Sequence, residues 1–312
     1  MVIRDKEIKV ATKKKVMVTG SAGFIAPHIV KHFANEGWNI VAVDCLEVKN
    51  QIPGVEYIRG DVRELLPKQI LGVNVIVHLA FVTNIPNSVR SPVVTTFDNI
   101  DMTVKLLKLA TDHGVERFVF PSTASLYGTN PIPWVENMPS DPIEPYSWQK
   151  FSCESLMKMW SSRYEMETVS LRFFQIYGEN QREDTALAAF IRSRLKNIPI
   201  TLTETTAQST FRTAQRDFVY VGDVAEAVYL AAISENVGKG EVLNVGSGIR
   251  TEMSKIAETI GGDIVFIPRR SFEVEAHQAS TETTERLIGW KYKVNVLEWL
   301  KNFVEKKLNE NK

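Results

Sequence analysis

The sequence predicts an α/β fold in which a parallel sheet carries helices on both faces. Short apolar segments alternate with amphipathic helical segments from residue 16 onward, an order that is typical of parallel sheets. The predicted strands are rich in Val, Ile and Phe and show little polar alternation, as expected for strands covered on both faces. A glycine-containing turn joins the first strand to the first helix. These three features indicate a doubly wound sheet.

The strand-helix unit can be followed along the chain in order. The predicted strands are VMVT (16–19), NIVAVD (39–44), a third that ends near RGDVRE (59–64), VNVIVHLAF (73–81), RFVFPST (117–123) and TVSLRFFQIYG (168–178). The longest predicted helix in the first half is TTFDNIDMTVKLLKLATDHG, residues 95–114. RDFVYVGDVAEAVYLAAI, residues 216–233, restores the strand-then-helix order, and VLEWLKNFVEKKL forms a final helix.

Composition and charge exclude several classes of function. Lys plus Arg and Asp plus Glu both total 37, so no broad charge favours nucleic acid or an anionic membrane. Cys45 and Cys153 show no metal-ligand spacing, and we interpret both as packing residues in a reducing compartment. No acidic third ligand follows His28 and His32 at the spacing of a metalloprotease, so we predict no metal. The chain has no signal-peptide pattern or apolar run of transmembrane length, which predicts a soluble cytoplasmic protein.

The glycine turn predicts a dinucleotide site. Gly20, Gly23 and Ala26 lie between the first strand and the first helix, where glycines let a pyrophosphate approach the backbone and the helix N-terminus supplies donors. Asp44 ends the second strand about twenty residues later, where an acid accepts hydrogen bonds from ribose hydroxyls. A carboxylate there would repel a 2′-phosphate, which favours NAD over NADP. Asp61, after the third strand, is a candidate contact of the adenine.

A domain boundary is expected where this regular pattern ends. We predict that residues 1–177 form a Rossmann-type NAD-binding domain, with a returning segment at about 214–234. Residues 178–312 would then form mainly a smaller, interleaved substrate-binding domain. The polar stretch TETTAQSTFRTAQ, residues 203–215, is expected to be a loop or hairpin over a cleft.

Tyr146 and Lys150 are the candidate proton-transfer pair. Residues at i and i+4 share one helix face, and a nearby ammonium favours the phenolate, so we expect Lys150 to lower the pKa of Tyr146. Ser122 and Thr123 should emerge at the carboxyl end of a strand, where open α/β sheets place ligands. A hydroxyl at that position can hydrogen-bond a substrate alcohol or ketone.

Together with HLAF at 78–81, PYSWQK at 145–150 and RDFVYVGDVAEA at 216–227, these motifs resemble those of extended short-chain dehydrogenase/reductases. More narrowly, the chain resembles the NAD-dependent epimerase/dehydratase family that acts on nucleotide sugars, from about Val16 to Trp290. The resemblance implies that Tyr146 is the acid/base, that Lys150 holds the nicotinamide ribose and that Thr123 completes a triad, with Ser122 as a competing candidate. It also implies that the NAD site includes Phe24, Ile25, Val62, Leu79, Ala80 and Asn99. For Asn99, an amide on the helix surface is an equally good interpretation.

The resemblance also narrows the reaction. Dehydratases of this family place an Asp-Glu pair directly after the triad hydroxyl, whereas this chain has Ala124 and Ser125. Elimination is therefore disfavoured, and the expected activity is that of a UDP-sugar 4-epimerase that works by transient oxidation and re-reduction. An NAD(P)-dependent reductase or dehydrogenase is the alternative, and a catalytically silent dinucleotide-binding protein is a third.

On the substrate side, Arg216 matches the arginine that grips the diphosphate in relatives, and Arg269 with Arg270 could add phosphate contacts. Gln175 stands where relatives usually have asparagine. By resemblance, we also expect a homodimer formed through helices near residues 95–113 and 150–165.

Overall fold

The structure, a computed structural model, describes residues 13–206, 208–268 and 274–310. Within these residues, the larger sheet has seven strands: β1 (Lys15–Thr19), β2 (Asn39–Asp44), β3 (Glu56–Arg59), β4 (Val75–His78), β5 (Arg117–Thr123), β6 (Glu167–Phe173) and β10 (Lys239–Val245). They lie in the order β10-β6-β5-β4-β1-β2-β3, and every neighbouring pair is parallel. The predicted Rossmann-type fold is confirmed, and the order reverses between β1 and β4, where such sheets bind ligands at their carboxyl ends.

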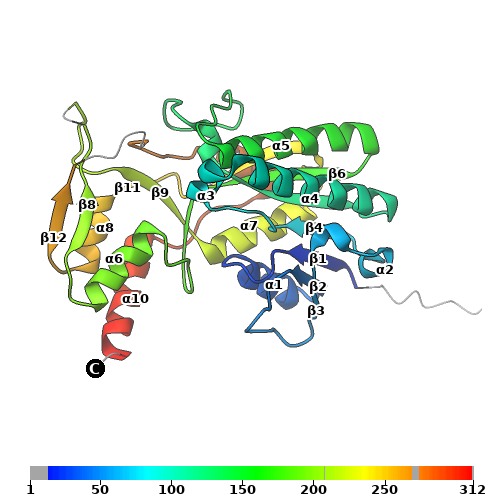
Figure 1. Cartoon of the computed structure of the whole chain (residues 1–312), viewed down its shortest axis with the longest axis horizontal. Helices are drawn as coiled ribbons and strands as arrows, with labels where there is room; N and C mark the ends of the chain where they lie inside the picture. The colour runs from blue at the N-terminus through cyan, green and yellow to red at the C-terminus, as the bar shows by residue number, and fades with distance from the viewer. Residues whose placement is uncertain (1–12, 207, 269–273, 311–312) are drawn as a thin grey trace, which may run out of the picture.

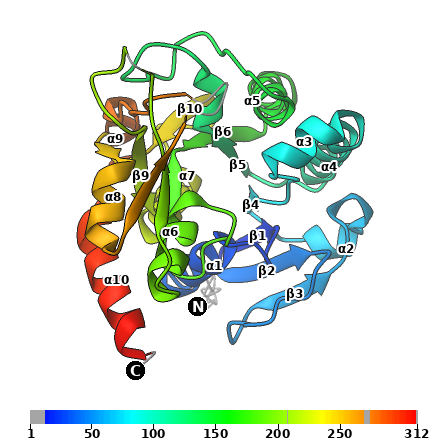
Figure 2. The ribbon, with the colours of Figure 1, turned by 60° about the vertical axis from the view of Figure 1, so that its left-hand side comes forward.

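Helices cover both faces of this sheet, as Figure 2 shows. One face is covered by α1 (Ala26–Asn35), α7 (Val221–Ile233) and α9 (Glu282–Ile288). The other face is covered by α2 (Pro67–Ile70), α4 (Pro92–Asp112) and α5 (Pro145–Tyr164), with the short α3 (Ile85–Arg90) against α4 and α5. Each face has its own core of Val, Ile, Leu and Phe side chains, which explains why the strands show little polar alternation.

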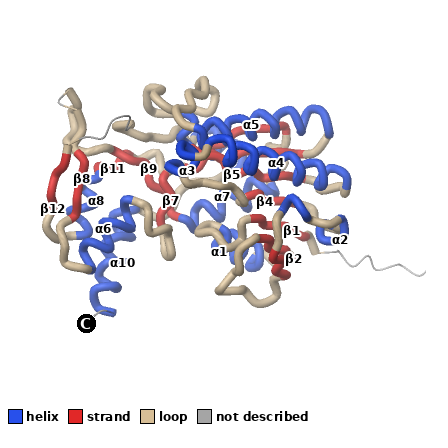
Figure 3. Tube along the Cα trace, in the orientation of Figure 1, coloured by secondary structure: helices blue, strands red, loops and turns tan. Residues whose placement is uncertain are grey.

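A smaller unit stands at one end of the molecule, on the left in Figures 1 and 3. It contains a three-stranded sheet of β7 (Gln175–Tyr177), β9 (Gln215–Tyr220) and β11 (Arg250–Glu252), and a pair formed by β8 (Ile200–Thr203) and β12 (Ile264–Ile267). Helices α6 (Ala186–Leu195), α8 (Met253–Ile260) and α10 (Val296–Glu310) pack around a separate apolar core. Two short 3-10 helices, η1 (Val62–Glu64) and η2 (Ala124–Tyr127), follow strands of the larger sheet.

Two features of the topology differ from the prediction. The segment 168–178 is two strands instead of one, because the chain leaves the larger sheet after Phe173 and β7 pairs with β9. The segment 216–233 also has a strand in a different sheet than expected, although its helix α7 packs on the larger sheet. β9 belongs to the small sheet, and α7 with β10, which pairs with β6, completes the larger one. Apolar content predicts a strand but not the sheet that receives it. The division into two domains near residue 177 stays a prediction.

Smaller expectations can also be compared with the structure. Residues 203–215 contain a hairpin-like contact, in which Glu204 and Thr213 form an antiparallel bridge. Cys153 is buried as expected, but the packing interpretation of Cys45 was wrong, since its thiol is exposed just after β2. Among the described residues, no helix is long and apolar enough to cross a membrane, and no cluster of three potential ligands could hold a metal ion.

Candidate active site

The glycine turn between β1 and α1 requires a glycine at position 20. Gly20 has a positive φ of 71°, and a Cβ there would lie 2.6 Å from the backbone N of Ala80 and 2.8 Å from the carbonyl carbon of Leu79. The amide of Gly23 donates to the carbonyl oxygen of Gly20 at 3.1 Å and closes the turn. The structure therefore brings the turn and residues 79–80, both predicted to bind NAD, into direct contact.

The first helix begins directly after this turn. Ala26, the third small residue of the motif, is almost fully buried in the core between α1 and the sheet, while Phe24 and Ile25 are partly exposed just before it. Pro27 lies in the first turn, where a missing N–H leaves no helical bond unmade. The free amides at this N-terminus are suited to a pyrophosphate.

Asp44 stands at the carboxyl end of β2 beside the glycine turn. Its carboxylate accepts from the amides of Ala22 at 2.9 Å and Leu46 at 2.8 Å, which fixes its orientation. Each carboxylate oxygen can accept further bonds, so ribose hydroxyls remain compatible with these contacts. The close turn, the helix N-terminus and this acid together fit a dinucleotide without a 2′-phosphate.

Asp61 is held by its own neighbour. Arg63 donates to both carboxylate oxygens, with Nη2 at 2.6 Å from Oδ2, and its Nη1 reaches Asp98 at 2.9 Å. These hydrogen bonds keep the pKa of Asp61 below its usual value. Val62 follows as a buried residue of η1. A contact of Asp61 and Val62 with the adenine stays a prediction.

The candidate catalytic pair lies in the first two turns of α5. Glu144 caps this helix, since its carboxylate accepts from the amides of Tyr146 at 2.7 Å and Ser147 at 3.0 Å. Sequence reasoning missed Glu144. An acid directly before a proline at a helix start is the signal that could have found it. The cap fixes the helix turn from which Tyr146 projects.

Thr123 is the hydroxyl that the structure places beside Tyr146. It ends β5, and its hydroxyl lies close enough to the Tyr146 phenol to act against the rise in the pKa of that group. Its Oγ1 also lies 3.0 Å from the hydroxyl of Ser125. Ser122, the competing candidate, instead donates to Glu154 at 2.5 Å, and Glu154 forms a buried ion pair with Arg172 at 2.8 Å. The Ser122 hydroxyl is therefore hydrogen-bonded to the ion pair, and Thr123 is the hydroxyl next to Tyr146.

Lys150 is nearly completely buried. Its Nζ donates to the carbonyl oxygen of Pro121 at 2.6 Å and lies 3.7 Å from the centroid of the Phe81 ring and 4.5 Å from that of Phe120. Burial lowers the pKa of Lys150 to about 7. Phe81, from the HLAF segment, was not among the predicted site residues, although its place after a buried strand end was a usable signal.

The expected direction of the Tyr146 pKa was wrong. Burial raises the pKa of Tyr146 to about 12, while the Thr123 hydroxyl and the positive charge of Arg182 act in the opposite direction. The ammonium of Lys150 is directed to Pro121 and the two phenylalanine rings, so desolvation of the phenol outweighs any benefit from it. Arg182 was also missed, because an arginine in a loop carries no sequence signal of proximity.

Asn99 is fully buried, so the surface interpretation was wrong. Its Oδ1 accepts from the amide of Val82 at 2.7 Å, and its Nδ2 donates to Gln149 Oε1 at 2.8 Å. Asn99 thus holds the loop that follows β4, which includes Leu79 and Ala80.

The predicted substrate residues Gln175 and Arg216 line one pocket of about 430 Å³. Thr83 and Arg182 belong to the same wall, and Arg182 Nη1 donates to Thr83 Oγ1 at 2.8 Å. The Arg216 guanidinium donates to the carbonyl oxygens of Gln215 at 2.9 Å and of Glu275 at 3.3 Å. Arg269 and Arg270 lie outside the described residues.

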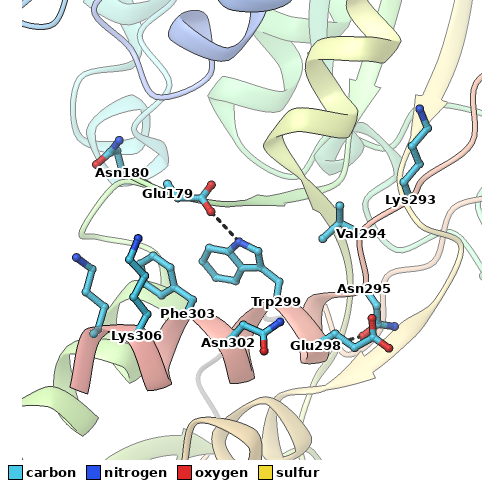
Figure 4. A pocket seen from close by; sticks show the side chains of 11 residues that line it. Glu179, Asn180, Lys293, Val294, Asn295, Glu298, Trp299, Asn302, Phe303 and Lys306 are labelled. Carbon is cyan, nitrogen blue, oxygen red and sulfur yellow. Dashed lines mark hydrogen bonds between the residues drawn. The ribbon is translucent and has the colours of Figure 1, made fainter. Parts of the chain in front are cut away.

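A larger pocket of about 610 Å³ lies along α10 (Figure 4). Trp299 and Phe303 stack in its wall, and Trp299 Nε1 donates to Glu179 Oε1 at 3.0 Å. None of the predicted site residues lines it, so size alone does not locate the chemistry.

A Rossmann-type sheet whose strand ends bring a threonine hydroxyl to a Tyr-Lys pair on one helix defines an NAD-dependent enzyme of the extended short-chain dehydrogenase/reductase class. Comparison with known proteins agrees with this class. The model of the NAD dependent epimerase/dehydratase family matches residues 16–246. The chain therefore belongs to that family, and its cofactor is NAD.

Similar proteins cover nearly the whole chain. A Methanocaldococcus jannaschii protein, described provisionally as a UDP-glucose 4-epimerase, is 31% identical over 95% of this chain and 99% of its own. The crystal structure of Thermus thermophilus UDP-glucose 4-epimerase with NAD is 28% identical, with a TM-score of 0.82 over 93% of this chain and 98% of that one. UDP-N-acetylglucosamine 4-epimerase from Methanobrevibacter ruminantium, in complex with UDP-N-acetylmuramic acid, is 26% identical, with a TM-score of 0.86 over 96% and 99%.

Gly20→Ala is expected to weaken NAD binding by about tenfold or more. The new Cβ would clash with the backbone at Ala80, and the resulting displacement and strain would cost about 1–3 kcal/mol. Gly37→Ala is the matched control, since Gly37 has a similar φ of 76° but no atom within 4 Å of its Cβ position. That variant should lose about 1 kcal/mol of stability and keep its NAD affinity. Calorimetric titration with NAD and urea unfolding measure both effects, and equal loss of affinity in the two variants would contradict the argument.

The buried ammonium of Lys150 predicts a pH-dependent stability. Because its pKa falls from 10.5 to about 7 on folding, the unfolded chain binds the extra proton between these values. The free energy of unfolding of the nucleotide-free protein should therefore gain about 1.4 kcal/mol per pH unit from this residue as the pH rises through the window. Lys150→Met should lose this pH dependence. Between pH 7 and 9, its free energy of unfolding should exceed that of the wild type by most near pH 7. Urea unfolding from pH 7 to 9 tests this, and Lys158→Met, at an exposed position on the same helix, is the control. A difference in unfolding free energy between the wild type and Lys150→Met that stays constant with pH would contradict the argument.

Proposed function

We propose that this enzyme is a UDP-sugar 4-epimerase that oxidises the sugar to a keto intermediate and reduces it again. The observation that carries the proposal is the pairing of Thr123 with Tyr146 while the next two positions, Ala124 and Ser125, offer no acid for elimination. The names of the similar proteins support the same reaction and a uridine-linked sugar.

The chain's own groups divide the work of this reaction. Tyr146 takes the proton of the sugar hydroxyl in the oxidation and returns it in the reduction, while Thr123 hydrogen-bonds the same oxygen. Because burial raises the pKa of Tyr146 to about 12, the base needs nearby positive charge, and Arg182 is the residue whose charge acts on the phenol. Lys150 would hold the nicotinamide ribose. Arg216 and Gln175 would hold the diphosphate.

Bound NAD supplies the group that accepts and then returns the hydride. The residues that would hold it, besides Tyr146 and Lys150, are Gly20, Gly23, Phe24, Ile25, Asp44, Asp61, Val62, Leu79, Ala80 and Asn99. Several of these already touch one another, as the contact of Gly20 with Ala80 and the bond from Asn99 to the following loop illustrate. A cytoplasmic location remains a prediction.

An NAD(P)-dependent reductase or dehydrogenase is the second candidate. The observation in its favour is Gln175, whose extra methylene changes the pocket that it shares with Arg216. Net oxidation would change the NADH absorbance in proportion to product, whereas epimerisation leaves no net change.

Homodimerisation is a further part of the proposal. Helices α4 and α5 lie side by side and expose large apolar side chains, with Val93 80%, Phe97 65% and Trp148 48% exposed. Exposed apolar clusters of this kind mark contact surfaces. A second copy that presents the same two helices would cover this face by forming a four-helix bundle.

Purified enzyme is expected to interconvert UDP-glucose and UDP-galactose without added cofactor. Tyr146→Phe should lower the turnover number by about 10²-fold to 10⁴-fold, because the ring stays but its proton-transfer group is lost. Tyr164→Phe, at the far end of the same helix and 44% exposed, is the matched control and should keep full turnover. Chromatography of the nucleotide sugars measures both. Failure of the wild-type enzyme with UDP- and dTDP-sugars alike would sink the proposed reaction.

Phe97→Glu is expected to convert the dimer to a monomer, because it places a charge among the exposed apolar side chains of α4. Light scattering after gel filtration should show twice the chain mass of 35.3 kDa for the wild type and the single chain mass for the variant. Val265→Glu, on β12 and 48% exposed, is the control and should leave the mass unchanged. A wild-type mass of one chain would rule out the dimer.

A further inference from the structure

Gln149 lies on α5 between Tyr146 and Lys150 and is fully buried. Its side chain turns toward α4, where Nε2 donates to the hydroxyls of Thr95 at 3.1 Å and Thr96 at 2.9 Å, and Oε1 accepts from Asn99 Nδ2 at 2.8 Å. Both N–H groups and the oxygen of the amide therefore have partners. Such a satisfied buried amide fixes orientation, since a shift of either helix would leave polar groups unpaired.

Asn99 carries this constraint to the loop after β4. Its Oδ1 accepts from the amide of Val82 at 2.7 Å, and its Nδ2 also donates to the Val82 carbonyl oxygen at 3.2 Å. Both backbone groups of Val82 are thus held by one side chain. Residues 79–84 have no regular secondary structure, so these bonds replace the ladder that would otherwise fix this segment.

The loop contacts α5, the helix that carries Tyr146 and Lys150, through Phe81. The Phe81 ring centroid lies 3.7 Å from Lys150 Nζ and 6.1 Å from the Tyr146 ring, which it meets edge to face. Leu79 and Ala80, on the other side of Phe81, contact the glycine turn. A displacement of residues 79–84 would therefore reach Tyr146, Lys150 and the nucleotide-binding turn together.

We propose that Gln149 is a positioning residue of the active site: through Asn99, it sets the loop 79–84 against the helix that carries Tyr146 and Lys150. Gln149 touches neither of the reacting groups, so its effect passes through the loop. The inference rests on the proposed epimerase activity for its kinetic test. The position of the loop itself can be measured without substrate.

Gln149→Met keeps the length of the side chain and removes its three hydrogen bonds. The expected result is a fall in kcat of about tenfold to 10²-fold, as for a small misplacement of reacting groups, with KM for the UDP-sugar within about threefold. Hydrogen exchange of the amides of residues 79–84 should become faster in the substrate-free enzyme. Asn99→Ala should have the same two effects. The double variant should show no larger fall in kcat and no faster exchange than either single variant, because both substitutions interrupt the same chain of hydrogen bonds from Gln149 through Asn99 to the loop.

Thr168→Val is the matched control. The Thr168 hydroxyl is also fully buried and donates to the carbonyl oxygen of Met157 at 2.8 Å, nearer the other end of α5. This variant should lower Tm but leave kcat and the exchange of residues 79–84 unchanged. A purely structural role for Gln149 predicts the same pattern for Gln149→Met, so an unchanged kcat with a lowered Tm would overturn the proposal.

Two further outcomes are decisive. If kcat falls while exchange at residues 79–84 stays as in the wild type, positioning through the loop is wrong. If the wild-type enzyme turns over no nucleotide sugar, the proposed function fails, and the exchange experiment alone still decides whether Gln149 holds the loop. Should Gln149→Met not fold, Thr96→Val removes one acceptor of the Gln149 amide, and it should give smaller changes of the same kind in kcat and exchange; no change in either overturns the proposal.

Discussion

The close approach of two backbone segments is the constraint on which the rest of this active site depends. Gly20 and Ala80 lie so near each other that a single Cβ would be 2.6 Å from a backbone nitrogen. This contact joins the turn after β1 to the loop after β4 across the point where strand order reverses. The same loop is held from its other side by Asn99, and it carries the ring that covers Lys150. The predicted nucleotide site and the candidate proton-transfer pair therefore share one short segment of chain.

Burial sets the electrostatic state of the catalytic groups more strongly than their charges do. The pKa of Lys150 is lowered to about 7 and that of Tyr146 is raised to about 12, so desolvation disfavours the charged form of both side chains. The aromatic faces of Phe81 and Phe120 partly offset this cost for the ammonium. The charged form of Lys150 consequently costs stability near neutral pH.

The sequence contained enough local information to predict the Rossmann-type sheet and the turn at Gly20, because each depends on periodicity or on residues close in sequence. The triad of Thr123, Tyr146 and Lys150 came instead from the resemblance to a known family, and the roles of its members stay predictions. Other features depend on contacts between distant segments. The chain switches sheets after Phe173, and Gln149 belongs to a circuit through α4, yet neither fact has a local pattern. The direction of the Tyr146 pKa was wrong for the same reason, since burial is a property of the packed structure.

The packing around Thr123, as well as the residue types that follow it, disfavours elimination chemistry. Ala124 is only 5% exposed and belongs to an apolar cluster with Tyr127, Trp134 and Phe174. A carboxylate at this position would lose its hydration among aromatic rings, at a cost of several kcal/mol unless a new partner accompanied it. The next hydroxyl, that of Ser125, is bonded to Thr123. A change to dehydration would therefore require repacking of the cluster together with new acids, so the present core favours the reversible oxidation that Tyr146 and Thr123 can support.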